Sequence, residues 1–203
     1  MNSTKTPRRP LWKRWWIRIV VILLAAIGAG LWYISPAPLP PPRSSGESMQ
    51  AIVYDEYGSP DVLRLEQVGK PLPGDSQLLI RIRAAAANPL DWHYLRGTPY
   101  LMRMESGYRR PVDTRLGVDM AGVVVAVGKD VTQFKPGDAV FGTANGAFAE
   151  YALASQKRIA LKPANLSFEQ AAGVPVAALT ALQALRDKGQ LQPGQKVLIN
   201  GAS

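Results

Sequence analysis

The stretch Leu79-Ile80-Arg81-Ile82-Arg83 decides the fold class, because apolar and charged residues alternate along it. A period of two places both isoleucines on the buried face of a strand and both arginines on the solvent face. Other short apolar segments follow, separated by turns rich in glycine and proline, which is typical of a β-barrel or sandwich. We expect strands at Ala51–Tyr54, Val123–Val127, Ala139–Phe141, Phe148–Leu153 and Ile159–Leu161, the second of them apolar enough for burial on both faces.

The pattern changes to a helical one after Leu166. Ser167 and Gln170 have the spacing of a capping box, which predicts a short helix that Gly173 and Pro175 interrupt. A second helix is expected from Ala177 to Lys188, ended by Gly189.

The last residues predict an apolar strand, Val197–Ile199, that runs into the small-residue loop Asn200-Gly201-Ala202-Ser203. Dinucleotide-binding folds begin their phosphate site in this way, with loop amides and a helix N-terminus around the pyrophosphate. A helix that leads into a buried strand indicates the opening of an α/β domain after the β domain.

A membrane-spanning helix is predicted near the N-terminus. Trp15 to Ile34 is a run of twenty residues with one charge, Arg18, near its start. A helix of about 20 residues spans roughly 30 Å, the thickness of a hydrocarbon core. Tryptophans stand at both ends of the run, as in interfacial belts. The alternative, a buried core helix, needs neither these tryptophans nor the flanking basic residues.

Positive charge is concentrated in the same region. Residues 1–43 hold seven Lys and Arg and no acid, whereas the remainder holds 17 basic and 15 acidic residues. Such asymmetry predicts a single-pass anchor with a cytoplasmic N-terminus and the folded region outside, although the inverted orientation stays open, and it argues against a nucleic-acid partner. The anchor is expected to be uncleaved, because the candidate cleavage site Ser35-Pro36-Ala37 is followed by Pro38. A twin-arginine export signal at Arg8-Arg9 stays open beside ordinary positive-inside charge. The absence of cysteine excludes disulfides, thiolate zinc sites and a cysteine nucleophile.

These patterns divide the chain into successive parts. A proline-rich spacer, expected to be semi-rigid, would hold the folded region off the bilayer. The final part is short for a cofactor domain, so we expect a truncated domain that leaves this chain inactive on its own. The expected parts are the basic tail 1–14, the membrane helix 15–34, the spacer 35–48, the β domain 49–166 and the start of a nucleotide-binding domain 167–203.

An ordered series of motifs between Met49 and Ser203 resembles the medium-chain dehydrogenase/reductase superfamily, specifically its zinc-free quinone-oxidoreductase-like branch. The series is more specific than any single motif in it. The matching segments are Asn88-Pro89-Leu90-Asp91, Gly117-Val118-Asp119-Met120-Ala121-Gly122 with Val127-Gly128, Lys135-Pro136-Gly137-Asp138, Leu179-Thr180-Ala181 and Pro193 to Ser203.

The resemblance implies a mainly β fold. A GroES-like β-barrel would be followed by the first helices and first strand of a truncated Rossmann α/β domain, and preceded by one transmembrane helix. NADPH or NADH would bind with a quinone or an α,β-unsaturated carbonyl substrate in the cleft, where the cofactor donates a hydride from C4 of its nicotinamide. Zinc-dependent relatives carry cysteine and histidine ligands near the positions of Asn88 and Asp119, so no metal is expected. A homodimer stays open.

The candidate site residues come from the same resemblance. Asn88 is expected to contact the cleft, because its amide both donates and accepts, or to be a turn residue before Pro89. Asp91 either orients a neighbour or forms a local Asx-turn. His93 stands where close relatives often have a tyrosine beside the nicotinamide, so it is either a substrate-carbonyl partner or an exposed loop residue.

The remaining candidates concern the cofactor. Thr180 is at a family cofactor-contact position, or else bonds back to its own helix. Gly201, Ala202 and Ser203 would approach the pyrophosphate.

Three functions follow from these expectations. The leading one is a membrane-anchored NAD(P)H-dependent oxidoreductase. The alternatives are a non-enzymatic anchored barrel that binds a ligand or partner, and an inactive pseudogene product.

Overall fold

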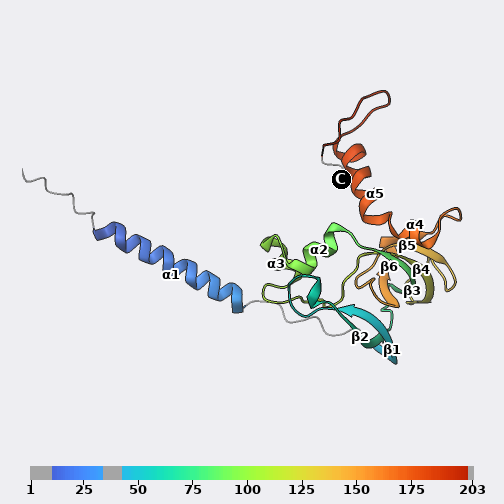
Figure 1. Cartoon of the computed structure of the whole chain (residues 1–203), viewed down its shortest axis with the longest axis horizontal. Coiled ribbons are helices and arrows are strands. Elements are labelled where there is room, and N and C mark those ends of the chain that lie inside the picture. The colour runs from blue at the N-terminus through green and yellow to red at the C-terminus, as the bar shows by residue number, and fades with distance from the viewer. Residues whose placement is uncertain (1–10, 34–42, 201–203) are drawn as a thin grey trace, which may run out of the picture.

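The computed structural model describes residues 11–33 and 43–200, and its centre is an antiparallel sheet of five strands (Figure 1). The strands follow the order β6-β3-β4-β5-β7, and a separate hairpin is made of β1 and β2. Their bounds are β1 Ser44–Val53, β2 Arg64–Pro71, β3 Gln77–Ala86, β4 Asp119–Val127, β5 Ala139–Thr143, β6 Tyr151–Ser155 and β7 Ile159–Leu161.

The hairpin is joined to the larger sheet through its first strand. Ile52 N donates to Phe148 O at 2.8 Å, and Glu150 N donates to Gln50 O at 3.0 Å. Glu150 O in turn accepts from Ile82 N of β3 at 2.9 Å, so the bend before β6 links the two sheets. This arrangement confirms the expected β-barrel-like domain.

Alternation along β3 places its apolar residues as the sequence predicts. Ile80 is fully buried and Ile82 packs against the same core, while Arg81 is exposed. The core around Ile80 also contains Met120 and Val124 of β4, and each such buried side chain contributes roughly 1.5–3 kcal/mol.

Several strand predictions need correction. Val125 of β4 is 38% exposed, so burial on both faces is wrong there: one face of β4 is open to solvent at this end. The segment from Phe148 becomes a strand only at Tyr151, because residues 148–150 form the bend that joins the hairpin. Ser44–Ser48, expected in the spacer, belong to β1, which pairs with β2 along the edge of the domain.

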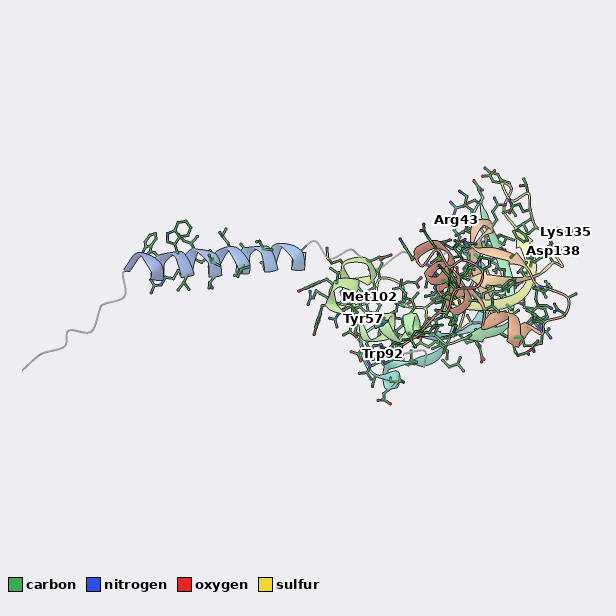
Figure 2. The ribbon with its side chains drawn as sticks, turned by 90° about the horizontal axis from the view of Figure 1, so that it is seen from above. Arg43, Tyr57, Trp92, Met102, Lys135 and Asp138 are labelled. Carbon is green, nitrogen blue, oxygen red and sulfur yellow. The ribbon has the colours of Figure 1, made fainter. Side chains whose placement is uncertain are left out.

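The turn over Phe134–Asp138 forms as expected. Gly137 has φ +94°, and Asp138 N donates to Lys135 O at 3.2 Å. An ion pair of 3.0 Å between Lys135 and Asp138 lies at the end of the folded region farthest from the N-terminal helix α1 (Leu11–Tyr33), as Figure 2 shows.

Most of the helices are short, and α4 (Phe168–Ala172) packs on the five-stranded sheet. The capping box at Ser167 and Gln170 is confirmed by two reciprocal hydrogen bonds of 2.9 and 3.1 Å. Ala171 and Ala172 then bury against Ala121, so the first helix after Leu166 packs on the barrel itself. The helices are η1 Pro60–Val62, α2 Pro89–Arg96, η2 Tyr100–Met102, α3 Arg103–Ser106, η3 Gln156–Arg158 and α4 Phe168–Ala172.

The segment after α4 extends away from the sheet (Figure 1). α5 (Pro175–Leu182) continues into a π-helical stretch, η4 (Gln183–Lys188), which confirms the second helix. Gly189 follows in a right-handed conformation, and the left-handed residue is Gln190 with φ +46°. The strand predicted over Val197–Ile199 does not form: Leu198 is 93% exposed, and a strand needs a neighbour that no other described strand supplies.

The predicted helix at the N-terminus is present as α1 (Leu11–Tyr33), and its apolar side chains from Trp15 to Ile27 are exposed. A bilayer core needs about 20 predominantly apolar residues. Among the helices in residues 11–33 and 43–200, none combines the length and apolarity that a membrane crossing requires, so the predicted transmembrane helix is not supported. The basic tail up to residue 10, Ile34 and most of the spacer lie outside the described residues.

Candidate functional site

The site begins where β3 ends and α2 starts. Asn88 is the N-cap of α2: its Oδ1 accepts from Leu90 N at 2.9 Å, and Pro89 occupies the first helical position. Asp91 Oδ2 accepts from Asn88 N at 2.9 Å, which completes a capping box. The local role of Asn88 before Pro89 is therefore that of a helix cap, and Asp91 bonds back to Asn88 N and does not form the Asx-turn considered for it.

Asp119, the first residue of β4, connects this cap to α5. It is 1% exposed, and its Oδ2 accepts from Asn88 Nδ2 at 3.3 Å. The same carboxylate accepts from Val176 N at 3.1 Å through Oδ1 and 3.3 Å through Oδ2. Because Val176 is in the first turn of α5, the negative charge lies at the positive end of that helix. We call this set of contacts the Asp119 bridge.

Burial governs the ionisation of both carboxylates. Burial raises the pKa of Asp119, and hydrogen bonds from Val176 N and Asn88 oppose the rise. Burial likewise raises the pKa of Asp91, with the backbone N–H groups of Asn88, Gly117 and Val118 acting in the opposite direction. Asp91 is 4% exposed; its Oδ1 meets no described donor within full hydrogen-bond geometry, so the N–H groups of Gly117 and Val118 stabilise this carboxylate only weakly.

Asp91 lines a cavity of about 490 Å³, here called the α2 cavity. Leu90 and Tyr94 of α2 form one wall, and Val118 and Val176 lie on the side of the Asp119 bridge. A volume of this size suits a small organic molecule. The cavity therefore has a buried carboxylate beside apolar surface.

His93 is on the same helix but is not among the residues that line the α2 cavity. Its Nδ1 lies 2.6 Å from Thr98 O, and its ring meets Trp92 edge-on at 5.0 Å. A carbonyl oxygen only accepts, so Nδ1 carries the hydrogen and Nε2 is left to bind another group.

Of the residues expected to contact the cofactor, the structure describes Asn88 and Thr180. Thr180 is exposed on α5, one helical turn beyond Val176, or about 6 Å along the axis. Gly201, Ala202 and Ser203 lie outside the described residues.

The structure brings Asn88 and Asp91 together and adds Asp119 and Val176, whose roles the sequence did not reveal. A signal for Asp119 was available: an acid directly before a strongly apolar strand is buried and therefore needs hydrogen-bond donors. Within residues 11–33 and 43–200, no cluster of three or more His, Cys, Asp or Glu side chains could hold a metal ion.

Comparison with known proteins connects this barrel to oxidoreductases. The chain is 38% identical over 158 residues to the quinone oxidoreductase of Lama guanicoe, a match that covers 76% of this chain and 46% of that protein. It is also 38% identical over 168 residues to the chloroplastic NADPH-dependent alkenal/one oxidoreductase of Arabidopsis thaliana, covering 77% and 42%. The solved quinone oxidoreductase from Coxiella burnetii superposes with a TM-score of 0.64 at 34% identity, covering 73% of this chain and 47% of that one.

The chain thus spans about half the length of the curated relatives it matches. Residues 74–164 match the family model of the alcohol dehydrogenase GroES-like domain. Together with the relatives, this match supports placing the barrel in the N-terminal part of the medium-chain dehydrogenase/reductase superfamily.

Proposed function

We propose that the barrel belongs to an NADPH-dependent oxidoreductase that transfers a hydride to a quinone or an α,β-unsaturated carbonyl. The observation that carries the proposal is the Asp119 bridge, which ties the Asn88 amide to the first turn of α5. Val176 of the bridge lines the α2 cavity, as do Leu90 and Asp91, which follow Asn88 in the chain. The names of the quinone and alkenal/one oxidoreductases that resemble this chain support the same chemistry.

The residues present fit the nicotinamide end of such a cofactor. Asp91 is a buried carboxylate on the lining of the α2 cavity, and a polar group of a bound nicotinamide would lie beside it. Thr180 offers an exposed hydroxyl one turn along α5 from the bridge.

Bound NADPH would supply the hydride itself. The protein's part is positioning and charge stabilisation. Asn88 gives one N–H of its Nδ2 to Asp119, and the second N–H remains for a substrate carbonyl oxygen, where negative charge develops. His93 does not line the α2 cavity, so the proposal gives it a contact only with a part of the substrate that extends beyond that cavity. The Thr98 carbonyl holds its Nδ1–H, which leaves Nε2 for this contact.

The proposal is tested by NADPH oxidation with a benzoquinone, followed by absorbance, in the protein that contains this barrel. Asn88→Ser keeps an oxygen for the N-cap but removes the amide N–H, so we expect kcat to fall about tenfold to a hundredfold with the fold retained. Asn165→Ser, an exposed change on the same domain, is the matched control and leaves kcat unchanged. If NADPH fails to bind in a fluorescence titration of that protein, the proposal is wrong.

A further inference from the structure

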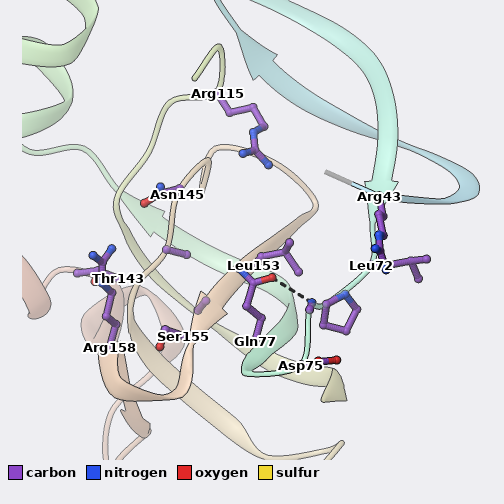
Figure 3. A pocket seen from close by; sticks show the side chains of 14 residues that line it. Arg43, Leu72, Asp75, Gln77, Arg115, Thr143, Asn145, Leu153, Ser155 and Arg158 are labelled. Carbon is purple, nitrogen blue, oxygen red and sulfur yellow. Dashed lines mark hydrogen bonds between the residues drawn. The ribbon is translucent and has the colours of Figure 1, made fainter. Parts of the chain in front are cut away.

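A second cavity of about 750 Å³, drawn in Figure 3, shares part of its lining with the α2 cavity. The two have Arg115, Thr143, Asn145 and Arg158 in common. We call the second one the arginine cavity, because Arg43, Arg115 and Arg158 line it from three sides.

The positive charge of this cavity is only partly compensated. Arg115 is held by Asp113 through Nε and Nη2, each at 3.1 Å, which leaves its Nη1 for another acceptor. The acid on the lining, Asp75, pairs with Lys129 at 2.9 Å. Within the part of the chain that the structure describes, Arg43 and Arg158 have no acidic partner.

Neutral polar groups on the lining add further donors. Thr143, Asn145 and Ser155 contribute hydroxyl and amide groups, and Figure 3 shows Gln77 already engaged with the backbone N–H of Gly74 at 3.0 Å. Leu72 and Leu153 provide apolar surface beside them. Such a lining suits a ligand with a short carbon skeleton and at least one strongly accepting group.

We infer that the arginine cavity is a binding site for a small anion that bears a carboxylate or phosphate group. Guanidinium groups match these oxyanions because they present pairs of N–H donors in a planar fork. Three arginines with two uncompensated charges raise the local concentration of anions, and the cavity volume lies in the range of small-molecule sites. The inference does not depend on the proposed hydride transfer.

Calorimetric titration of the full chain with citrate and, separately, with inorganic phosphate tests the site. We expect binding by at least one probe, weakened when ionic strength rises from about 0.02 M to about 0.2 M. Citrate alone would identify a carboxylate ligand and phosphate alone a phosphate ligand, and both results support the site. Glycerol, a neutral probe, is expected to give no binding.

Arg158→Gln and Arg43→Gln are each expected to weaken binding about fivefold or more, because each removes one charged fork. Lys157→Gln is the matched control: it removes the same charge from the neighbouring position, which does not line the cavity. In the wild-type protein, nuclear magnetic resonance is expected to show shifts of the Arg43 and Arg158 Nε–H signals when the probe is added. This measurement needs no substitution, so a folding defect in a variant cannot affect it. Absence of binding by both probes, or equal weakening by Lys157→Gln and Arg158→Gln, overturns the inference.

Discussion

The carboxylate of Asp119 satisfies donors from two elements that are far apart in the sequence. Replacing it with alanine leaves Val176 N and Asn88 Nδ2 unpaired in a buried place. We expect Asp119→Ala to lower the free energy of unfolding by about 2 kcal/mol, the usual cost of unsatisfied buried donors. Urea denaturation measures the change. Asp187→Ala, which removes an exposed partner of Arg186, should stay within about 0.5 kcal/mol, and a similar loss in both variants would contradict the role of the bridge.

Asp91 makes stability depend on pH. Burial raises its pKa above the ordinary 3.8, so the folded protein holds this proton more tightly than the unfolded chain does. The stabilisation is complete below the ordinary pKa and is lost as pH rises through the raised folded value. We therefore expect the unfolding free energy of the wild type, relative to Asp91→Asn, to fall as pH increases from about 3.5 upward. Parallel denaturation curves at several pH values check the sign, and a relative stability that rises with pH would refute it.

Contacts between residues close in the sequence could be predicted from it, whereas contacts between distant residues could not. The capping box of Asn88 and Asp91 involves neighbours on the chain, and such short spacings are readable in the sequence. The bonds of Asp119 span 31 residues to Asn88 and 57 to Val176. No local sequence pattern identifies a partner so far away in the chain, so the Asp119 bridge could be identified only from the structure.

At the scale of elements, Gly122 of β4 leaves no room for a side chain against β3. A Cβ built there would lie 2.2 Å from the backbone oxygen of Arg81, which cannot move without disturbing the ladder. We expect Gly122→Ala to cost about 1–3 kcal/mol of stability by overpacking. Thermal unfolding by circular dichroism measures it. Gly173→Ala, where the nearest atom is 3.7 Å away, is the matched control, and equal losses in the two variants would rule out this explanation.

Elements with strong patterns were predictable from sequence, and elements that depend on pairing were not. The alternation of Ile80 and Ile82 with Arg81 identifies β3 without reference to any neighbour. β2 has a mostly exposed, polar sequence, and it forms because β1 supplies its hydrogen bonds. Val197–Ile199 is the opposite case. Its apolar composition favours a strand, but none forms because no described strand pairs with it.

At the scale of the whole molecule, α1 stands apart from the barrel with its apolar side chains exposed (Figure 1). We expect a variant that begins at Arg43 to keep the urea midpoint of the barrel, because Arg43 O still accepts from Leu72 N at 2.7 Å. We also expect less self-association, since exposed apolar surface promotes it. Light scattering and denaturation measure the two effects. A clear drop in the midpoint would mean that the barrel depends on contacts from the removed residues.

The Asp119 bridge also makes the opening of α5 measurable by hydrogen exchange. The Val176 amide can exchange its hydrogen for deuterium only when α5 lifts from the strand edge and its bond to Asp119 breaks. Its exchange rate therefore reports how often this opening occurs. We expect Val176 to exchange more slowly than Ala177, and the Asp119→Ala change to abolish the difference. Nuclear magnetic resonance would read this rate directly, and a ligand that clamps α5 onto the barrel would slow it further.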